Sequence, residues 1–324
     1  MKIKLIATTL WIMVAASCGS GASHEPIYIE RFDSIEMIYT SLPASERVAV
    51  LSRYTPQIDF LQTLYGVSSA DSAMAQASAS EAVNVFGPDI KKRITDLSAV
   101  EERLGQLKAS LKEVLPTAEM PARISGIILP YRQSIVTADS LMLVSLNHYM
   151  GPDYEGYAIF DPYTRRQKNL DLLPYHVAEA IVTSAYPYQY SENATVLSRL
   201  LYEGAVIETL RRLFEDADVA VLMGYDSAQM QSLMQNESTL WQRVVDRGML
   251  YDVDRMTAAK LIDPANATSI VSSDAPPRAG RFLGWKIVNS YTRSHSEVSA
   301  AELLVPDFYL SDSALKEANY SPGN

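Results

Sequence analysis

Apolar residues recur at helical spacing along most of the chain and at strand-like spacing in one short region. The segment Ser98-Ala99-Val100-Glu101 matches a helix-capping box, and apolar residues follow it at alternating steps of four and three until Pro116. This pattern predicts a helix that ends at the proline. Similar apolar stripes predict two later helices, from Leu173 to Ser184 and over about residues 195–214.

Strand character is confined to the middle of the chain. Residues 123–129 and 140–146 form the two candidate strands, and residues 137–139 between them fit a chain reversal. Ten of the 13 residues from 68 to 80 are Ser or Ala, which fits either a flexible insertion or a weakly packed helix. The sequence therefore predicts a mainly α protein with a small β-sheet (α+β), folded as one compact domain.

The first 18 residues resemble the export signal of a bacterial lipoprotein. Lys2 and Lys4 precede an apolar run, residues 5–14, which is shorter than the roughly 20 residues that span a bilayer. Three small residues then lead to Cys18, the only cysteine. We therefore expect cleavage before Cys18 and attachment of a diacylglyceryl group to its sulfur. The alternative is an ordinary signal peptide followed by an unmodified thiol.

Cleavage at this position divides the chain and leaves an acidic body. The expected segments are a signal peptide (1–17), a flexible tether (18–26), an N-terminal helical region (27–116) and a core (117–324). The mature chain would keep 26 basic and 38 acidic residues, a net charge of −12. Such a chain is not drawn to anionic lipids or to nucleic-acid phosphates. We therefore expect membrane attachment through the lipid on Cys18, with Gly19 compatible with the outer membrane, and no nucleic-acid partner.

Candidate chemistry centres on the two helices predicted after the sheet. His176 and Glu179 share one strip of the first helix, because they are three residues apart. Glu203 takes an otherwise apolar stripe position on the second helix, where a carboxylate is costly to bury alone. Glu203 is therefore either a structural ion-pair or protonated residue, or a ligand-binding residue. Arg278 and Arg281 are candidate partners for such a carboxylate.

The strip around His176 has the layout of a zinc-peptidase helix without its working residues. Zincin-type peptidases carry His-Glu-x-x-His, in which the histidines bind zinc and the glutamate acts as a base. With His176 at the first ligand position, Val177 takes the position of the base and Ala180 that of the second ligand. Neither side chain can accept a proton or bind a metal. We therefore predict no catalytic residue, no metal and no cofactor.

Tyrosines and glycines mark two further features. Eight of the 19 tyrosines lie between Tyr149 and Tyr190, where they either pack the core or form a recognition surface. Gly280 and Gly284, four residues apart, favour the close approach of a second helix. The expected place for a binding groove is among the following side chains: His176, Glu179, Glu203, Tyr175 and Tyr202.

Several blocks of the sequence resemble the GldB family of Bacteroidetes lipoproteins. The blocks are Tyr149-Met150-Gly151-Pro152-Asp153-Tyr154, residues 173–186 and 201–207, Trp241 with Leu250-Tyr251, and the segment from Gly280 to Tyr291. Their order and spacing carry the resemblance, which runs from about residue 27 to the C-terminus.

The resemblance implies an envelope lipoprotein associated with gliding motility and its secretion apparatus. It also implies distant kinship to zincin-type peptidases, and thus a zincin-like helical body that covers the core, residues 117–324. We expect a lipid-anchored, non-enzymatic envelope protein that acts through contacts with other envelope proteins. The alternatives are a zinc metallopeptidase with non-standard ligands and an envelope lipoprotein that binds glycans or peptides.

Overall fold

The computed structural model describes residues 24–130, 133–138, 140–264, 267–311 and 313–323. The expected lipidation site Cys18 and the expected signal peptide lie outside these ranges, as does Asp139 in the predicted reversal. None of the helices in the described ranges combines the length and the apolar character needed to cross a membrane.

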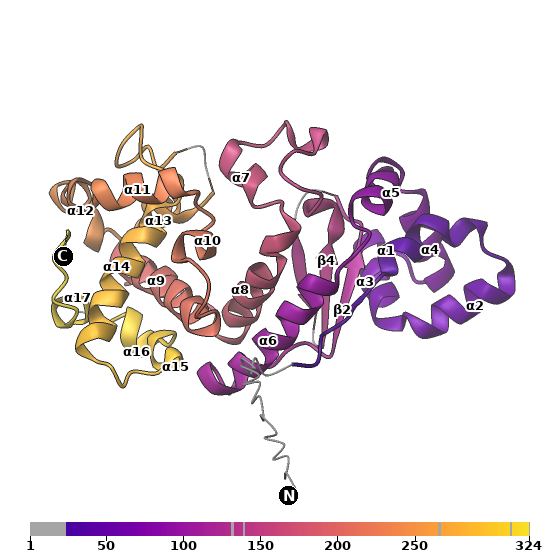
Figure 1. The fold of residues 1–324 in the computed structure, drawn as a ribbon, viewed down its shortest axis with the longest axis horizontal. Coiled ribbons are helices and arrows are strands. Elements are labelled where there is room, and N and C mark those ends of the chain that lie inside the picture. The colour runs from indigo at the N-terminus through magenta and orange to yellow at the C-terminus, as the bar shows by residue number, and fades with distance from the viewer. Residues whose placement is uncertain (1–23, 131–132, 139, 265–266, 312, 324) are drawn as a thin grey trace, which may run out of the picture.

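A four-stranded sheet stands between two groups of helices (Figure 1). Its strands are β1 (Ile29–Glu30), β2 (Arg123–Ile127), β3 (Ile135–Ala138) and β4 (Leu141–Ser145). The N-terminal group comprises α1 (Phe32–Ile38), α2 (Ala44–Arg53), α3 (Thr55–Tyr65), α4 (Ala70–Ala79) and α5 (Glu81–Arg93). The architecture confirms the predicted mainly α fold with a small sheet.

The second group begins at the opposite side of the sheet and contains most of the remaining helices (Figure 1). Its longer helices are α6 (Ser98–Val114), α8 (Leu173–Ala185), α9 (Val196–Leu213), α11 (Ser227–Gln235), α12 (Glu237–Asp246), α13 (Arg255–Ile262) and α14 (Ala279–Ser294). Shorter ones are α7 (Pro162–Arg166), α10 (Val219–Leu222), α15 (Ala300–Leu303), α16 (Pro306–Tyr309) and α17 (Ala314–Glu317). Single 3₁₀ turns lie at Tyr39–Ser41, Leu146–His148, Glu155–Tyr157, Leu170–Leu172 and Met249–Tyr251.

The sheet is mixed, with the strand order β1-β2-β4-β3. The two predicted strands, now β2 and β4, are confirmed, and they pair in parallel with Ile124 opposite Met142. The predicted reversal connects β4 to an additional antiparallel strand, β3, that forms one edge of the sheet. The other edge is β1, which pairs in parallel with β2 across more than 90 residues of sequence.

Strand β4 is buried on both faces, which explains its continuous apolar sequence. Leu141 and Leu143 pack into a core with the N-terminal helices. Met142 and Val144 point the other way, into the larger core that includes α6, α8 and α9. The sheet therefore separates two hydrophobic cores, and β3 borders the C-terminal one at the point where α8 contacts it.

The predicted helix after residue 98 is confirmed as α6, but its start differs from the prediction. The backbone N–H and the hydroxyl of Ser98 both donate to the carboxylate of Asp96, at 2.9 and 3.0 Å. Glu101 instead accepts a hydrogen bond from the backbone N–H of Ile29 at 2.9 Å. The expected capping box is therefore absent, because Glu101 ties β1 to α6.

Packing orders two segments, the Ser- and Ala-rich stretch that the sequence left open and the end of the expected flexible tether. The Ser- and Ala-rich stretch forms α4, in which Ala73, Met74 and Ala77 are buried in the N-terminal core. At the end of the expected tether, Glu25 lies so close to α6 that a methyl group at Gly105 would overlap its carbonyl oxygen. Small side chains thus allow close contact in both places.

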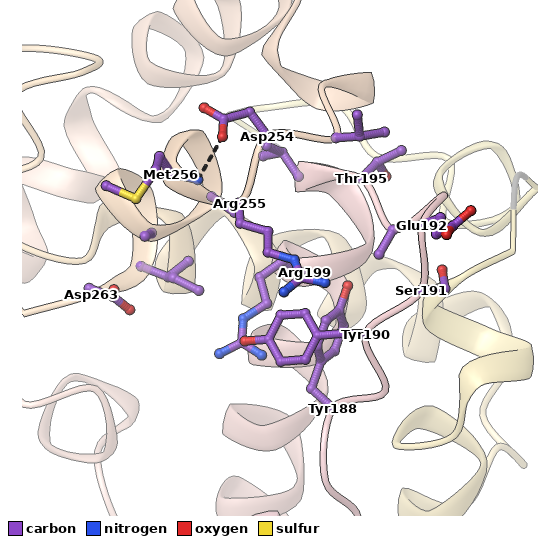
Figure 2. Close-up of a pocket in the computed structure, with 16 residues that line it drawn as sticks. Tyr188, Tyr190, Ser191, Glu192, Thr195, Arg199, Asp254, Arg255, Met256 and Asp263 are labelled. Atoms are coloured by element: carbon purple, nitrogen blue, oxygen red, sulfur yellow. Dashed lines mark hydrogen bonds between the residues drawn. The ribbon is translucent and has the colours of Figure 1, made fainter.

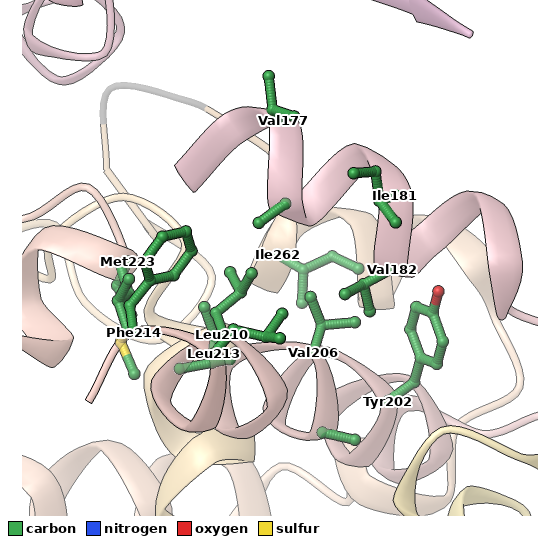
Figure 3. Packing of buried hydrophobic residues seen from close by; sticks show 14 of the residues in the cluster. Val177, Ile181, Val182, Tyr202, Val206, Leu210, Leu213, Phe214, Met223 and Ile262 are labelled. Atoms are coloured by element: carbon green, nitrogen blue, oxygen red, sulfur yellow. The ribbon is translucent and has the colours of Figure 1, made fainter. Parts of the chain in front are cut away.

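Helices α8, α9 and α14 form the centre of the C-terminal core. Figure 3 shows Val182 of α8 facing the apolar side chains of α9, among them Val206. On its other side α9 meets α14, the most extensive helix contact in the described part of the molecule. The close approach predicted from Gly284 is confirmed, because a methyl group there would overlap the carbonyl oxygen of Leu200.

We expect Gly284→Ala to lower the free energy of unfolding by about 3 kcal/mol, because backbone atoms of α9 cannot move aside without separating the helices. Gly87→Ala is the matched control in α5, where the added methyl group meets side-chain atoms of Met37 and Ile128 rather than an opposing backbone. Thermal and urea unfolding followed by circular dichroism measure both. Equal stability of the two variants would contradict the close helix contact.

Candidate functional site

The predicted site residues on α8 and α9 are joined by one buried arginine of α14. The Nη2 atom of Arg281 donates to Oε1 of Glu179 at 2.7 Å. Its Nε lies 3.0 Å from Oε2 of Glu203, an electrostatic contact in which the N–H does not point at the oxygen. Arg199, one turn before Glu203, reaches the other carboxylate oxygen, Oε1, at 3.0 Å. The four side chains form a continuous chain of alternating charges.

The charge chain is largely buried, so each of its ions depends on a partner of opposite charge. Arg281 is only 1% exposed and Glu203 only 7% exposed, and an ion in such a place needs a partner of opposite charge. Burial alone would raise the pKa of Glu179, but Arg281 and Arg278 hold this pKa below its usual range. Glu203 is thus a member of an ion pair, as one of the two sequence interpretations had it. Its predicted pairing with Arg281 is confirmed.

His176 lies close to Glu179 and Arg281 of this charge chain, and its imidazole is neutral near pH 7. Burial is the main cause that lowers the pKa of His176 to about 4, while Glu179 opposes the shift and nearby cations reinforce it. Its Nδ1 lies 3.1 Å from the hydroxyl of Tyr149. Because burial raises the pKa of Tyr149, the phenol keeps its proton and can donate it to this nitrogen.

Two adjoining cavities open beside His176. Their volumes are about 310 and 320 Å³, and we refer to them together as the central cavity. The residues that line both are Ser134, Tyr163, Gln167, His176 and Arg278. The first part also contains Tyr175, Glu179 and Arg281. The second part extends to His148 and Lys168.

The structure brings only some of the expected groove residues together. His176, Glu179 and Tyr175 line the central cavity, with Tyr175 packed edge-on against Phe214 at a ring separation of 4.7 Å. Glu203 lies behind the cavity wall and contacts it through Arg281. Tyr202 is elsewhere: its hydroxyl donates to the backbone carbonyl of Tyr186 at 2.7 Å, within an aromatic cluster.

A second hollow, of about 630 Å³, lies where the segment before α9 meets α13. We call it the tyrosine groove; it is lined by residues from 188–199 and 253–263. Figure 2 shows its two tyrosines beside two arginines. Arg199 lies over the ring of Tyr188 at 4.7 Å, and Arg255 lies over Tyr190 at 4.8 Å. Arg199 therefore connects this groove to the charge chain.

Several large apolar side chains of the tyrosine groove are exposed. Tyr190 is 61% exposed, Met256 61% and Val253 57%. Most tyrosines in the 149–190 region instead pack the core, as the hydroxyl of Tyr157 illustrates by donating to the carbonyl of Asn147 at 2.6 Å. Among the described tyrosines of the 149–190 region, Tyr190 is the most exposed to solvent.

The donors around His176 do not fit a zinc site. Within the described ranges, no group of three or more His, Cys, Asp or Glu side chains is placed to hold a metal ion. Glu179 and Glu203 are engaged by Arg281, and the positions after His176 that zinc chemistry requires are occupied by apolar side chains. His176 is left as one imidazole beside guanidinium groups, which repel a cation.

Sequence reasoning missed several residues of both hollows. Lys168 follows Arg165-Arg166-Gln167, a run that has the composition of a solvated surface segment, yet its side chain is almost fully buried beside His148. Arg278 was recognised as an ion-pair candidate but not as part of a cavity wall. Met256 and Arg255 carried no signal, because their role depends on the contact of α13 with the segment before α9.

The chain belongs to the family described as gliding motility protein GldB, whose model matches residues 21–322. This membership places it among the lipoproteins of the cell envelope that are associated with gliding motility. No curated protein and no solved structure matches the chain.

Replacing Arg281 with methionine should lower the free energy of unfolding by about 3–5 kcal/mol near pH 7, because Glu203 is left with one partner in a buried position. The deficit should be smaller at pH 4 than at pH 7. Loss of Arg281 removes the largest influence that lowers the pKa of Glu179, so acid neutralises this carboxylate more readily in the variant. Urea unfolding at both pH values measures this.

The matched control is Arg293→Met, an exposed position on the same helix, which should change stability little. Adding Glu203→Gln to Arg281→Met should restore part of the loss. An Arg281→Met protein as stable as wild type at pH 7 would contradict the structural role of the charge chain.

Proposed function

We propose that this protein is a lipid-anchored, non-enzymatic component of the cell envelope that acts through contacts with other envelope proteins. The observation that carries the proposal is the position of Arg281 between Glu179 and Glu203. Both carboxylates that hydrolytic chemistry could use are neutralised by a guanidinium, which offers no coordination position to water. Distant kinship to zincin-type peptidases is part of this proposal, supported by the helix that carries His176 lying against edge strand β3.

The tyrosine groove is the surface that supports a role in protein contacts. Tyr, Met and Arg are enriched at protein interfaces, because they combine large apolar area with polar or charged groups. Tyr190, Met256 and Arg255 meet in this groove, two of them more than half exposed. The acidic body of the mature chain keeps it from binding anionic lipid directly, so the groove remains accessible above the membrane surface.

The alternatives predict different observations. A metallopeptidase with non-standard ligands would hold stoichiometric zinc that is lost in His176→Ala, and it would show chelator-sensitive proteolysis. A glycan-binding lipoprotein is favoured by one observation, the open ring face of Tyr190 beside Arg255. In that case a sugar rather than a protein would occupy the tyrosine groove.

Cys18→Ala should move the protein from the membrane fraction to the soluble fraction. The two or three acyl chains anchor the wild-type protein, because each methylene group buried in the bilayer contributes about 0.8 kcal/mol, and the variant lacks these chains. Fractionation of whole cells, with separation of inner and outer membranes, measures the distribution. We expect the wild-type protein in the outer membrane. Retention of Cys18→Ala in either membrane would refute lipid attachment as the anchor.

A photo-crosslinking amino acid at position 190 should yield a discrete protein adduct in living cells, since Tyr190 lies at the proposed contact surface. The matched control is the same amino acid in place of Tyr28, which is 69% exposed but remote from the groove residues in sequence and fold. A Met256→Asp change should abolish the adduct at position 190. Adducts that contain glycan alone, or equal adducts at both positions, would contradict the proposed protein contact.

A further inference from the structure

Cationic side chains converge on the central cavity. Lys168, Arg278 and Arg281 line it, and the acidic residue among its described lining residues is Glu179. The imidazole of His148 is neutral as well as that of His176, because burial and the neighbouring Lys168 lower the pKa of His148 to about 3. Among its described lining residues the cavity therefore carries more positive than negative charge.

Glu179, the acidic residue among the described lining residues, is already engaged. Glu179 accepts the 2.7 Å hydrogen bond from Arg281, and Arg281 is shared with Glu203. Arg278, in contrast, forms an ion pair with none of the described carboxylates, and its Nε donates to the backbone carbonyl of Ile262 at 2.8 Å. Arg278 thus brings to the cavity a positive charge that has no ion pair with the described carboxylates. Lys168 brings a second cation, with its Nζ 2.8 Å from Nδ1 of His148.

Arg278 is also held in an uncommon backbone conformation. Its φ is +59°, in the left-handed region that favours glycine, and it occupies the N-cap position of α14. A left-handed arginine costs about 1 kcal/mol or more, so the surrounding fold holds this side chain at the cavity wall. The same wall receives the positive end of α14, a helix of 16 residues.

We propose that the central cavity binds the oxyanion group of a small ligand, a carboxylate or a phosphate, with Arg278 as its main contact and Lys168 as the second cation. A guanidinium can donate two parallel hydrogen bonds to such a group, and hydrogen bonds between ionised groups are roughly twice as strong as neutral ones. The hydroxyl of Ser134 and the amide of Gln167 line both parts of the cavity and supply further donors. This inference does not depend on the tyrosine groove or on its partner.

Arg278→Gly offers a direct test, because it deletes the guanidinium while glycine relieves the strain of the positive φ. Asn319→Gly is the matched control, a substitution at the other described non-glycine residue with positive φ, 45°. The full chain is titrated with inorganic phosphate, with sodium succinate and with sodium chloride of equal ionic strength. Thermal unfolding and isothermal calorimetry record binding.

We expect phosphate or succinate to bind at one site per chain and to raise the unfolding temperature, whereas chloride does not. Arg278→Gly should weaken this binding at least tenfold, Arg278→Lys should weaken it less, and Asn319→Gly should leave it unchanged. Binding of succinate alone identifies a carboxylate ligand, and binding of phosphate alone identifies a phosphate ligand. Absence of binding by both anions up to 10 mM, or binding that Arg278→Gly leaves intact, would overturn the proposal.

Discussion

The contact between α9 and α14 is the constraint on which the C-terminal half of the molecule depends. Gly204 and Gly284 face each other there, and neither position has room for a Cβ atom beside the opposing backbone. The charged residues lie next to these glycines in sequence or on the same helix face: Glu203 precedes Gly204, and Arg281 is three residues before Gly284. Close backbone contact leaves no room for side chains at Gly204 and Gly284. It thereby brings together the nearby residues Glu203 and Arg281, which form the buried ion pair.

The same ion pair organises both hollows of the surface. An ion in a buried position is stable only with partners of opposite charge, so each carboxylate of the chain is flanked by a guanidinium. Arg199 ends the chain in the wall of the tyrosine groove, and Glu179 ends it in the wall of the central cavity. Two surfaces formed by different segments are thereby fixed relative to one helix, α9, which is buried along almost its entire length.

The local sequence pattern predicted the helices and strands better than it predicted which of them pair or pack together. The periodic stripes of α6 and α9 lie within single segments, and a continuous apolar run is sufficient to identify β4. The parallel pairing of β1 with β2 joins residues more than 90 positions apart, and a two-residue strand has no pattern to detect. The capping box failed for a related reason, since Glu101 is taken by the backbone of Ile29.

The site was predictable to the same extent. His176 and Glu179 share a strip because helical spacing requires it, and a buried carboxylate such as Glu203 demands a cation. Which tyrosines join them is decided by packing between distant segments: Tyr175 turns toward the cavity and Phe214, whereas Tyr202 turns toward Tyr188. The role of Lys168 could not be inferred, because its burial beside His148 is created by the fold and not by its polar neighbours in sequence.

The cation between Glu179 and Glu203 differs from a metal ion in a way that bears on chemistry. A guanidinium neutralises two carboxylates and holds their helices together, as a divalent ion would. It is covalently attached to α14, however, and it has no open coordination position at which water could lose a proton. With Val177 and Ala180 at the adjacent positions of α8, the arrangement keeps the structural contribution of a bound cation without its capacity to activate water.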